Sequence, residues 1–355
     1  MNTLAQQPDT SRNTVLDIMK GLGILLIIYE HCYAIDIEFK RWTMSFVMPM
    51  FFLVSGYLYH PVENRWKHLQ KETARLVLPY IAGVTILAFV HFFVRHDLTW
   101  MGWVKWLVSA AGTNDYFCHY LPHWNSSVGA FWFFMALFWC RVIFNAVYTF
   151  AGKWKYIVLT LLATLGYLSL RYLIRLPLCI SEGLSVMVFF LVGHLFRNAQ
   201  TRYNQSTETT RHHYDLFGTI VLLLLFVLWC WTQKNSEMVC GMGYYKHHLL
   251  NILAACGMTY IYYWFCRGIA INLPATARLL TFAGHGSLFL LWIHKLSLHT
   301  VFFGLSVFGI PLPPMPLYIA FFLISQWVLC LACQLIVSQS DILSHFFGIY
   351  RPKQV

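Results

Sequence analysis

The sequence predicts an all-α integral membrane protein with about ten transmembrane helices and both termini in the cytoplasm. Of its 355 residues, 58% are hydrophobic and only 11% are charged. A soluble globular domain has roughly 25% charged residues. The apolar residues fall in runs of roughly 18 to 23, which is the length that crosses a bilayer as a helix. Trp and Tyr gather near the ends of these runs, as in the aromatic belts of membrane proteins.

Ten apolar runs are expected to form the helices, in one membrane domain over residues 1–355 with its core at 15–338. The short polar tails carry no long block that would fold as a separate soluble domain. No small-residue cleavage site follows the first run, so it is expected to be a retained helix rather than a signal peptide. The ten runs are 15–35, 43–60, 76–95, 127–149, 155–170, 178–196, 215–232, 247–266, 284–305 and 316–338.

The distribution of Lys and Arg predicts the orientation. With the N-terminus inside, the inner segments hold fourteen of these residues and the outer segments eight, which favours cytoplasmic termini. The net charge of +11 is scattered over short loops. No nucleic-acid partner is therefore expected, whereas membrane lipids are.

The ten cysteines show no pattern of a disulfide framework or a metal site. Most lie inside apolar runs, where Cys behaves as a small hydrophobic residue. Cys330 and Cys333 form a C-x-x-C without a second pair of ligands, so packing is favoured over metal or redox chemistry and no metal is expected.

The first run, LDIMKGLGILLIIYEHCYAID, carries ionisable groups that are costly in hydrocarbon. Lys20 and His31 are eleven residues apart, which is about 20° past three full turns, so they share one helix face roughly 16 Å apart. Asp17, one turn before Lys20, is expected to pair with it. Snorkelling of Lys20 to the interface is the alternative. His31 is a candidate general base, while Glu30 points about 100° away from it.

The second run, FVMPMFFLVSGYLYH, contains Pro49 and the Ser55-Gly56 pair, which allows close approach of another helix. The basic segment RWKHLQKETARLVLPY follows it. Its cations suit the phosphates of a nucleotide-like donor. They equally suit a positive-inside signal with lipid headgroup contacts, and both interpretations stay open.

The longest predicted loop, 96–126, lies outside in this topology and includes NDYFCHYLPHWNSS. Its aromatic and hydrogen-bonding groups suit sugar rings, which makes Tyr116, His119 and Trp124 candidate acceptor-binding residues. Interfacial anchoring by Trp and Tyr is the alternative interpretation.

Late in the chain stands FAGHGSLFLLWIHKLSLH, in which Ser287 and His294 are seven residues apart and share a helix face. A nucleophile and its base would need an orienting acid, and none is evident, so interhelical hydrogen bonding is favoured. His285 falls on the face opposite His294 and is not expected to take part.

Together these stretches resemble acyltransferase family 3, bacterial integral-membrane enzymes that include O-acetylases of cell-surface sugars. The resemblance covers nearly the whole chain. This chain departs from the family pattern with Lys20 for the usual Arg, Glu72 for the first Arg of an Arg-x-x-Arg pair, and Trp292 for a Tyr. The matching motifs lie at Lys20 and His31; Pro49, Phe51, Phe52, Ser55 and Gly56; Arg75 and Pro79; Trp132 and Phe133; and Ser287 and His294.

The resemblance implies an O-acyltransferase of the bacterial inner membrane. Its donor would be cytoplasmic acyl-CoA, with acetyl-CoA favoured and no bound cofactor. Its acceptor would be a hydroxyl of a glycan or lipid-linked saccharide. His31 would act as the base, tuned by Glu30. The residues expected to contact the donor are Lys20, Arg75 and Lys71, and those expected to line the pocket are Ser55, Ser287 and His294.

Two other functions fit the same composition. A transporter would move a glycan precursor or an acyl species through the ten predicted helices without chemistry. A non-catalytic membrane component of polysaccharide assembly would do neither.

Overall fold

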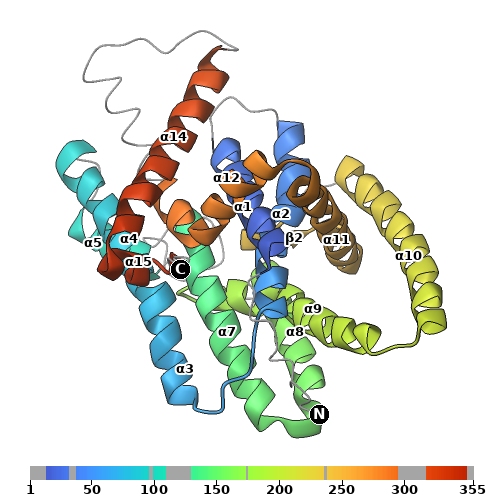
Figure 1. Cartoon of the computed structure of the whole chain (residues 1–355). Coiled ribbons are helices and arrows are strands. Elements are labelled where there is room, and N and C mark those ends of the chain that lie inside the picture. Colours follow the sequence, from blue (N-terminus) through green and yellow to red (C-terminus); the bar gives the residue numbers. More distant parts are fainter. Residues whose placement is uncertain are drawn as a thin grey trace, which may run out of the picture.

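The computed structural model describes residues 13–31, 37–95, 99–108, 129–172, 175–235, 238–294 and 317–349. Almost all of these residues are helical (Figure 1), which confirms an all-α membrane protein. All ten predicted runs overlap a helix. Within the described part, six helices are long and apolar enough to cross a membrane. The total of about ten crossings and the orientation of the termini stay predictions. The six are Arg65–Phe93, Gly129–Phe150, Ile180–Asn204, Tyr214–Lys234, Leu249–Asn272 and Ala320–Gln339.

The α-helices and strands follow one another along the chain with short helical turns between some of them. Their bounds are α1 (Thr14–Glu30), α2 (Ile37–Tyr57), α3 (Arg65–Glu72), α4 (Leu78–Val90), α5 (Trp100–Val108), α7 (Trp132–Phe150), α8 (Lys155–Tyr172), α9 (Ile180–Asn204), α10 (Glu208–Asn235), β1 (Met238–Val239), β2 (Tyr244–Tyr245), α11 (Leu249–Asn272), α12 (Pro274–His285), α14 (Leu317–Gln339) and α15 (Asp341–Phe346).

The structure departs from the predicted layout in several places. Helix α5 lies within the predicted loop 96–126, whereas α3 and most of α12 precede the predicted runs 76–95 and 284–305. Strands β1 and β2 form a small antiparallel hairpin, whose turn contains Gly243 at a φ of 62°. The predicted run 284–305 is not one continuous helix from its start. Helix α12 ends at His285, and a new helical segment covers residues 287–294. Gly286 separates the two segments, so a single helical wheel does not relate residues on either side of it.

Helices α1 and α2 each cross another helix at very short range. A Cβ on Gly21 of α1 would lie 1.9 Å from the Leu280 carbonyl oxygen of α12, and one on Gly284 would lie 1.9 Å from the Asp17 carbonyl oxygen. Helix α2 packs in the same way on α9 through Gly56. These small residues bring backbones together where lipid provides no hydrophobic drive for helix association. Helix α10 lies at the edge of the bundle against α11 (Figure 1).

A π-helical turn, Thr73–Val77, joins α3 to α4. Pro79 has no N–H, so it cannot complete the helical bond to the carbonyl of Arg75. The Leu78 N–H instead reaches back five residues to Thr73. The Pro79 carbonyl accepts a hydrogen bond of 2.8 Å from the Trp292 indole. The start of α4, directly after the turn that carries Arg75, is thereby attached to segment 287–294.

Candidate functional site

A cavity of about 410 Å³ lies among α1, α2, α3, α7 and α12. Four cationic side chains line it, together with one carboxylate and three histidines, so its polar part favours an anion. The polar lining residues are Lys20, Lys71, Arg75, Arg141, Glu72, His60, His68, His285, Ser55, Ser287 and Tyr59.

The cavity follows one face of α1, where Lys20, Ile24 and Ile27 line it in turn. Their spacing of four and three residues matches the helical repeat. On segment 287–294, Ser287 and Leu291 line it in the same way. The lining therefore changes from cationic near Lys20 to apolar near Ile27 and Leu291.

One corner of the cavity is a charge cluster where α1 meets α12. The Lys20 ammonium lies 2.7 Å from an Asp17 carboxylate oxygen, which confirms the predicted pair. The other Asp17 oxygen lies 3.4 Å from Nε2 of His285. Asp17 is buried, so both neighbours help to satisfy its charge. His285, which was not expected to take part, lines the cavity. Its role stays a prediction.

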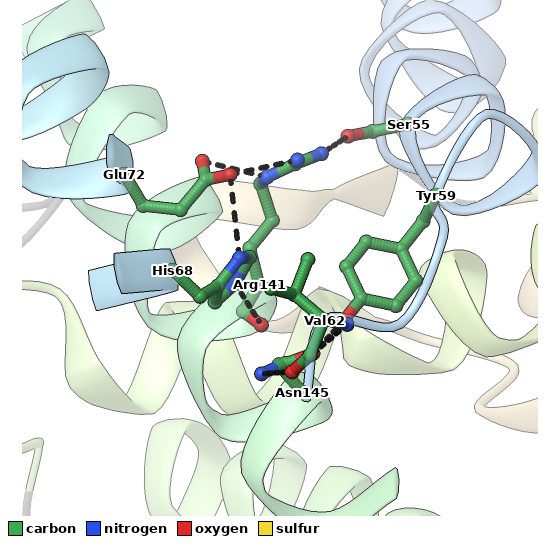
Figure 2. A network of polar contacts seen from close by, with 7 residues as sticks. All are labelled: Ser55, Tyr59, Val62, His68, Glu72, Arg141 and Asn145. Carbon is green, nitrogen blue, oxygen red and sulfur yellow. Dashed lines mark hydrogen bonds and ion pairs between the residues drawn. The ribbon is translucent and has the colours of Figure 1, made fainter. Parts of the chain in front are cut away.

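A second network joins α3, α2 and α7 around Arg141 (Figure 2). Its guanidinium binds both oxygens of Glu72, at 2.7 Å from Nε and 2.8 Å from Nη2. Nη1 donates to the Ser55 hydroxyl at 3.1 Å. The His68 ring donates from Nε2 to the Arg141 main-chain oxygen at 3.4 Å. Arg141 is thus attached to two neighbouring helices while its side chain lines the cavity.

The connection after α2 forms a wall of the cavity through Tyr59, His60 and Val62. The Asn145 amide holds it at two backbone points, accepting from the Val62 N–H at 2.9 Å and donating to the Val62 carbonyl at 3.0 Å. The Tyr59 hydroxyl also donates to Asn145 (Figure 2). From α9, Arg197 donates to the Tyr59 carbonyl at 2.8 Å. Two helices therefore fix this wall.

Replacing Asn145 by Leu is expected to loosen that wall. The substitution keeps the side-chain volume but leaves the Val62 N–H, the Val62 carbonyl and the Tyr59 hydroxyl without their partner. We expect a loss of about 2 to 4 kcal/mol of stability, since each buried unsatisfied group costs about 1–3 kcal/mol. Thermal unfolding of the purified protein measures this loss. Asn272→Leu, at the exposed end of α11, is the matched control, because its amide donates to the Gly268 carbonyl of the same helix at 2.9 Å. An unchanged melting temperature for Asn145→Leu would contradict the role of Asn145 in fixing this wall.

His31 and His294 lie side by side, with ring centroids 4.9 Å apart and ring planes at 66°. Nδ1 of His31 lies 2.8 Å from the Ile27 carbonyl oxygen, and Nδ1 of His294 lies 2.7 Å from that of Leu291. A carbonyl only accepts, so each Nδ1 carries a proton and the lone pair of the neutral ring is on Nε2. Ile27 and Leu291 both line the cavity, so the two imidazoles lie about one helical turn beyond that lining.

Glu30 lies away from the cavity, buried between α1 and α2. One of its oxygens accepts a hydrogen bond from the Thr43 hydroxyl. This position agrees with the predicted angle between Glu30 and His31 on the helix. The catalytic role suggested for Glu30 stays a prediction.

The structure brings most of the predicted site residues together. Lys20, Lys71, Arg75, Ser55 and Ser287 line the cavity, whereas His31 and His294 stand next to it. The three candidate acceptor-binding residues, Tyr116, His119 and Trp124, lie outside the described residues. Their roles all stay predictions.

Sequence reasoning missed Arg141, Glu72 and Asn145. A signal for Arg141 was present, because it is the only charged residue in the run 127–149. An ionisable residue inside a membrane helix points to a functional site with a nearby partner. The partner, Glu72, is distant in sequence, and the hydrophobic pattern of the two segments does not predict that they pair. Asn145 lies one helical turn after Arg141 on α7.

No cysteine is among the described residues that line the cavity. The cysteines there are free thiols, and Cys330 of the C-x-x-C is buried in packing. Within these same residues, no group of three His, Cys, Asp or Glu side chains is placed to hold a metal ion.

Comparison with known proteins identifies the chemistry to which this geometry is related. The family model for acyltransferase family 3, described as an acyltransferase domain, matches residues 13–333. The match includes every described residue that lines the cavity except Gly348. Searches of curated proteins and of solved structures found no match.

Proposed function

Because the chain belongs to acyltransferase family 3, we propose that it is an O-acyltransferase that uses acyl-CoA. The acyl group, which we take to be acetyl, passes to a hydroxyl of a glycan or lipid-linked saccharide. The protein acts as a multi-pass protein of the bacterial inner membrane with both termini in the cytoplasm. The cationic part of the cavity then faces the compartment that contains the donor.

The observation that carries this proposal is the change in polarity along the cavity. An acyl-CoA has phosphates at one end, a slender pantetheine arm, and a thioester at the other end. The cations of the cavity suit the phosphates, and the apolar lining near Ile27 and Leu291 suits the arm and the acyl group. The thioester would then lie near His31 and His294.

The chemical step needs a base for the acceptor proton. The acceptor hydroxyl oxygen attacks the thioester carbonyl carbon while Nε2 of His31 takes the hydroxyl proton. The new C–O bond forms, the C–S bond breaks, and the thiolate of CoA leaves and recovers a proton from the imidazolium. The hydrogen bond from Nδ1 to Ile27 keeps the His31 ring in the tautomer that this step requires. His294 lines the reaction space beside it.

Purified protein in detergent, given acetyl-CoA labelled in the acetyl group and a panel of candidate glycans, tests the proposal. We expect label in the glycan ester together with one free CoA thiol for each ester formed. Equivalent experiments in sealed vesicles separate the other functions. Movement of a glycan or acyl species without ester formation would establish a transporter, and neither product nor flux would indicate a non-catalytic component.

A further inference from the structure

Three side-chain hydrogen bonds fix the guanidinium of Arg141, and these bonds do not use all of its donors. A guanidinium has five N–H donors in a plane. Glu72 takes one on Nε and one on Nη2, and Ser55 takes one on Nη1. Two donors remain, one on each terminal nitrogen. The terminal nitrogens of a guanidinium can bind oxygens of a phosphate or a carboxylate.

The surroundings of the pair argue against stability as its main role. The Glu72 side chain is 1% exposed and that of Arg141 is 14% exposed. Removing two charges from water has a large desolvation penalty, and apolar residues of similar volume often give equal or greater stability. The more exposed partner is the one with donors left over, and it lines the cavity. Glu72 is therefore placed to orient the Arg141 guanidinium toward the cavity.

The charge balance supports an anionic ligand at this place. Glu72 neutralises one cation in the lining, and Asp17 is paired with Lys20. Lys71 and Arg75, also in the lining, lie on α3 and on the π-helical turn beside Glu72. An anion near Arg141 is thus close to positive charge from two more side chains.

We propose that Arg141 binds oxygens of a phosphate group of the acyl donor, and that Glu72 and Ser55 are positioning residues that hold its guanidinium toward the cavity. The assignment rests on the proposed function, because it takes the donor to be an acyl-CoA. It adds a phosphate contact from α7 to those expected from Lys20, Lys71 and Arg75. It also explains why the basic segment contains a carboxylate, since Glu72 orients Arg141.

Isothermal titration of the full-length protein in detergent with two probes tests the assignment. CoA carries phosphates, and pantetheine has the same thiol arm without them. Arg141→Lys keeps the charge but loses the planar fork. We expect it to weaken CoA binding about 10- to 100-fold and to leave pantetheine binding unchanged. Glu72→Gln is expected to weaken CoA binding in the same selective way, because one side of the fork loses its carboxylate.

Two further variants complete the test. Lys67→Gln removes a cation from α3 outside the cavity lining, and we expect normal binding of CoA. Ser55→Ala keeps the ion pair intact and is expected to weaken CoA binding severalfold, which tests the assignment even if the ion-pair variants do not fold. Wild-type affinity for CoA in a folded Arg141→Lys or Ser55→Ala variant would overturn this assignment alone. No CoA binding by the unaltered protein would overturn the proposed donor as well.

Discussion

Replacing His31 by Ala is expected to reduce acyl transfer about 100- to 10,000-fold, the range that a positioned general base contributes. The Nδ1–H of His31 is fixed on the Ile27 carbonyl at 2.8 Å, so the substitution removes a base whose tautomer is set. Donor binding should change little, because the ring stands beyond the part of the cavity where the cations lie. Initial rates of labelled ester formation at saturating donor measure the loss.

The control for His31→Ala is His345→Ala, which removes an exposed imidazole from α15. We expect this variant to keep the wild-type rate. Size-exclusion profiles and melting temperatures of both variants show whether each is folded. If folded His31→Ala protein keeps more than a tenth of the wild-type rate, His31 is not the base. In that case the neighbouring His294 becomes the group to test.

The sequence was sufficient to predict an all-α membrane protein and one face of the site. Composition predicted the membrane class, and helical periodicity placed Lys20 and His31 on the same side of α1. In the structure that side lines the cavity from Lys20 to Ile27 and continues to His31. Such predictions succeed because the positions lie within one unbroken helix, where geometry is local.

Features that join distant parts of the chain were not predicted. The pairing of Glu72 with Arg141 crosses 69 residues of sequence. The place of His285 in the cavity lining was not expected, because a single helical wheel was drawn through the break at Gly286. In the sequence, Glu72 was noted only as a departure from a family pattern. Its structural role is evident from its ion pair with Arg141. Long-range pairs of this kind depend on tertiary packing, which helical periodicity in the sequence does not predict.

Gly21→Ala and Gly284→Ala are expected to destabilise the fold by about 3 kcal/mol or more, at or above the upper end for overpacked sites. In each case the new Cβ would lie 1.9 Å from a main-chain carbonyl oxygen of the facing helix. A backbone cannot move aside as a flexible side chain does, so α1 and α12 must separate. The yield of folded protein and its melting temperature measure the effect.

Gly218→Ala on α10 is the matched control, because a Cβ at Gly218 has no described atom within 4 Å. Ala is a better helix former than Gly by about 1 kcal/mol, so this variant should be as stable as the wild type or more so. Equal melting temperatures for all three variants would show that the close crossing does not exist. The crossing also aligns Asp17 and Lys20 with His285, and Gly284 itself lines the cavity. Separating the two helices should therefore weaken donor binding even in the fraction of Gly284→Ala protein that folds.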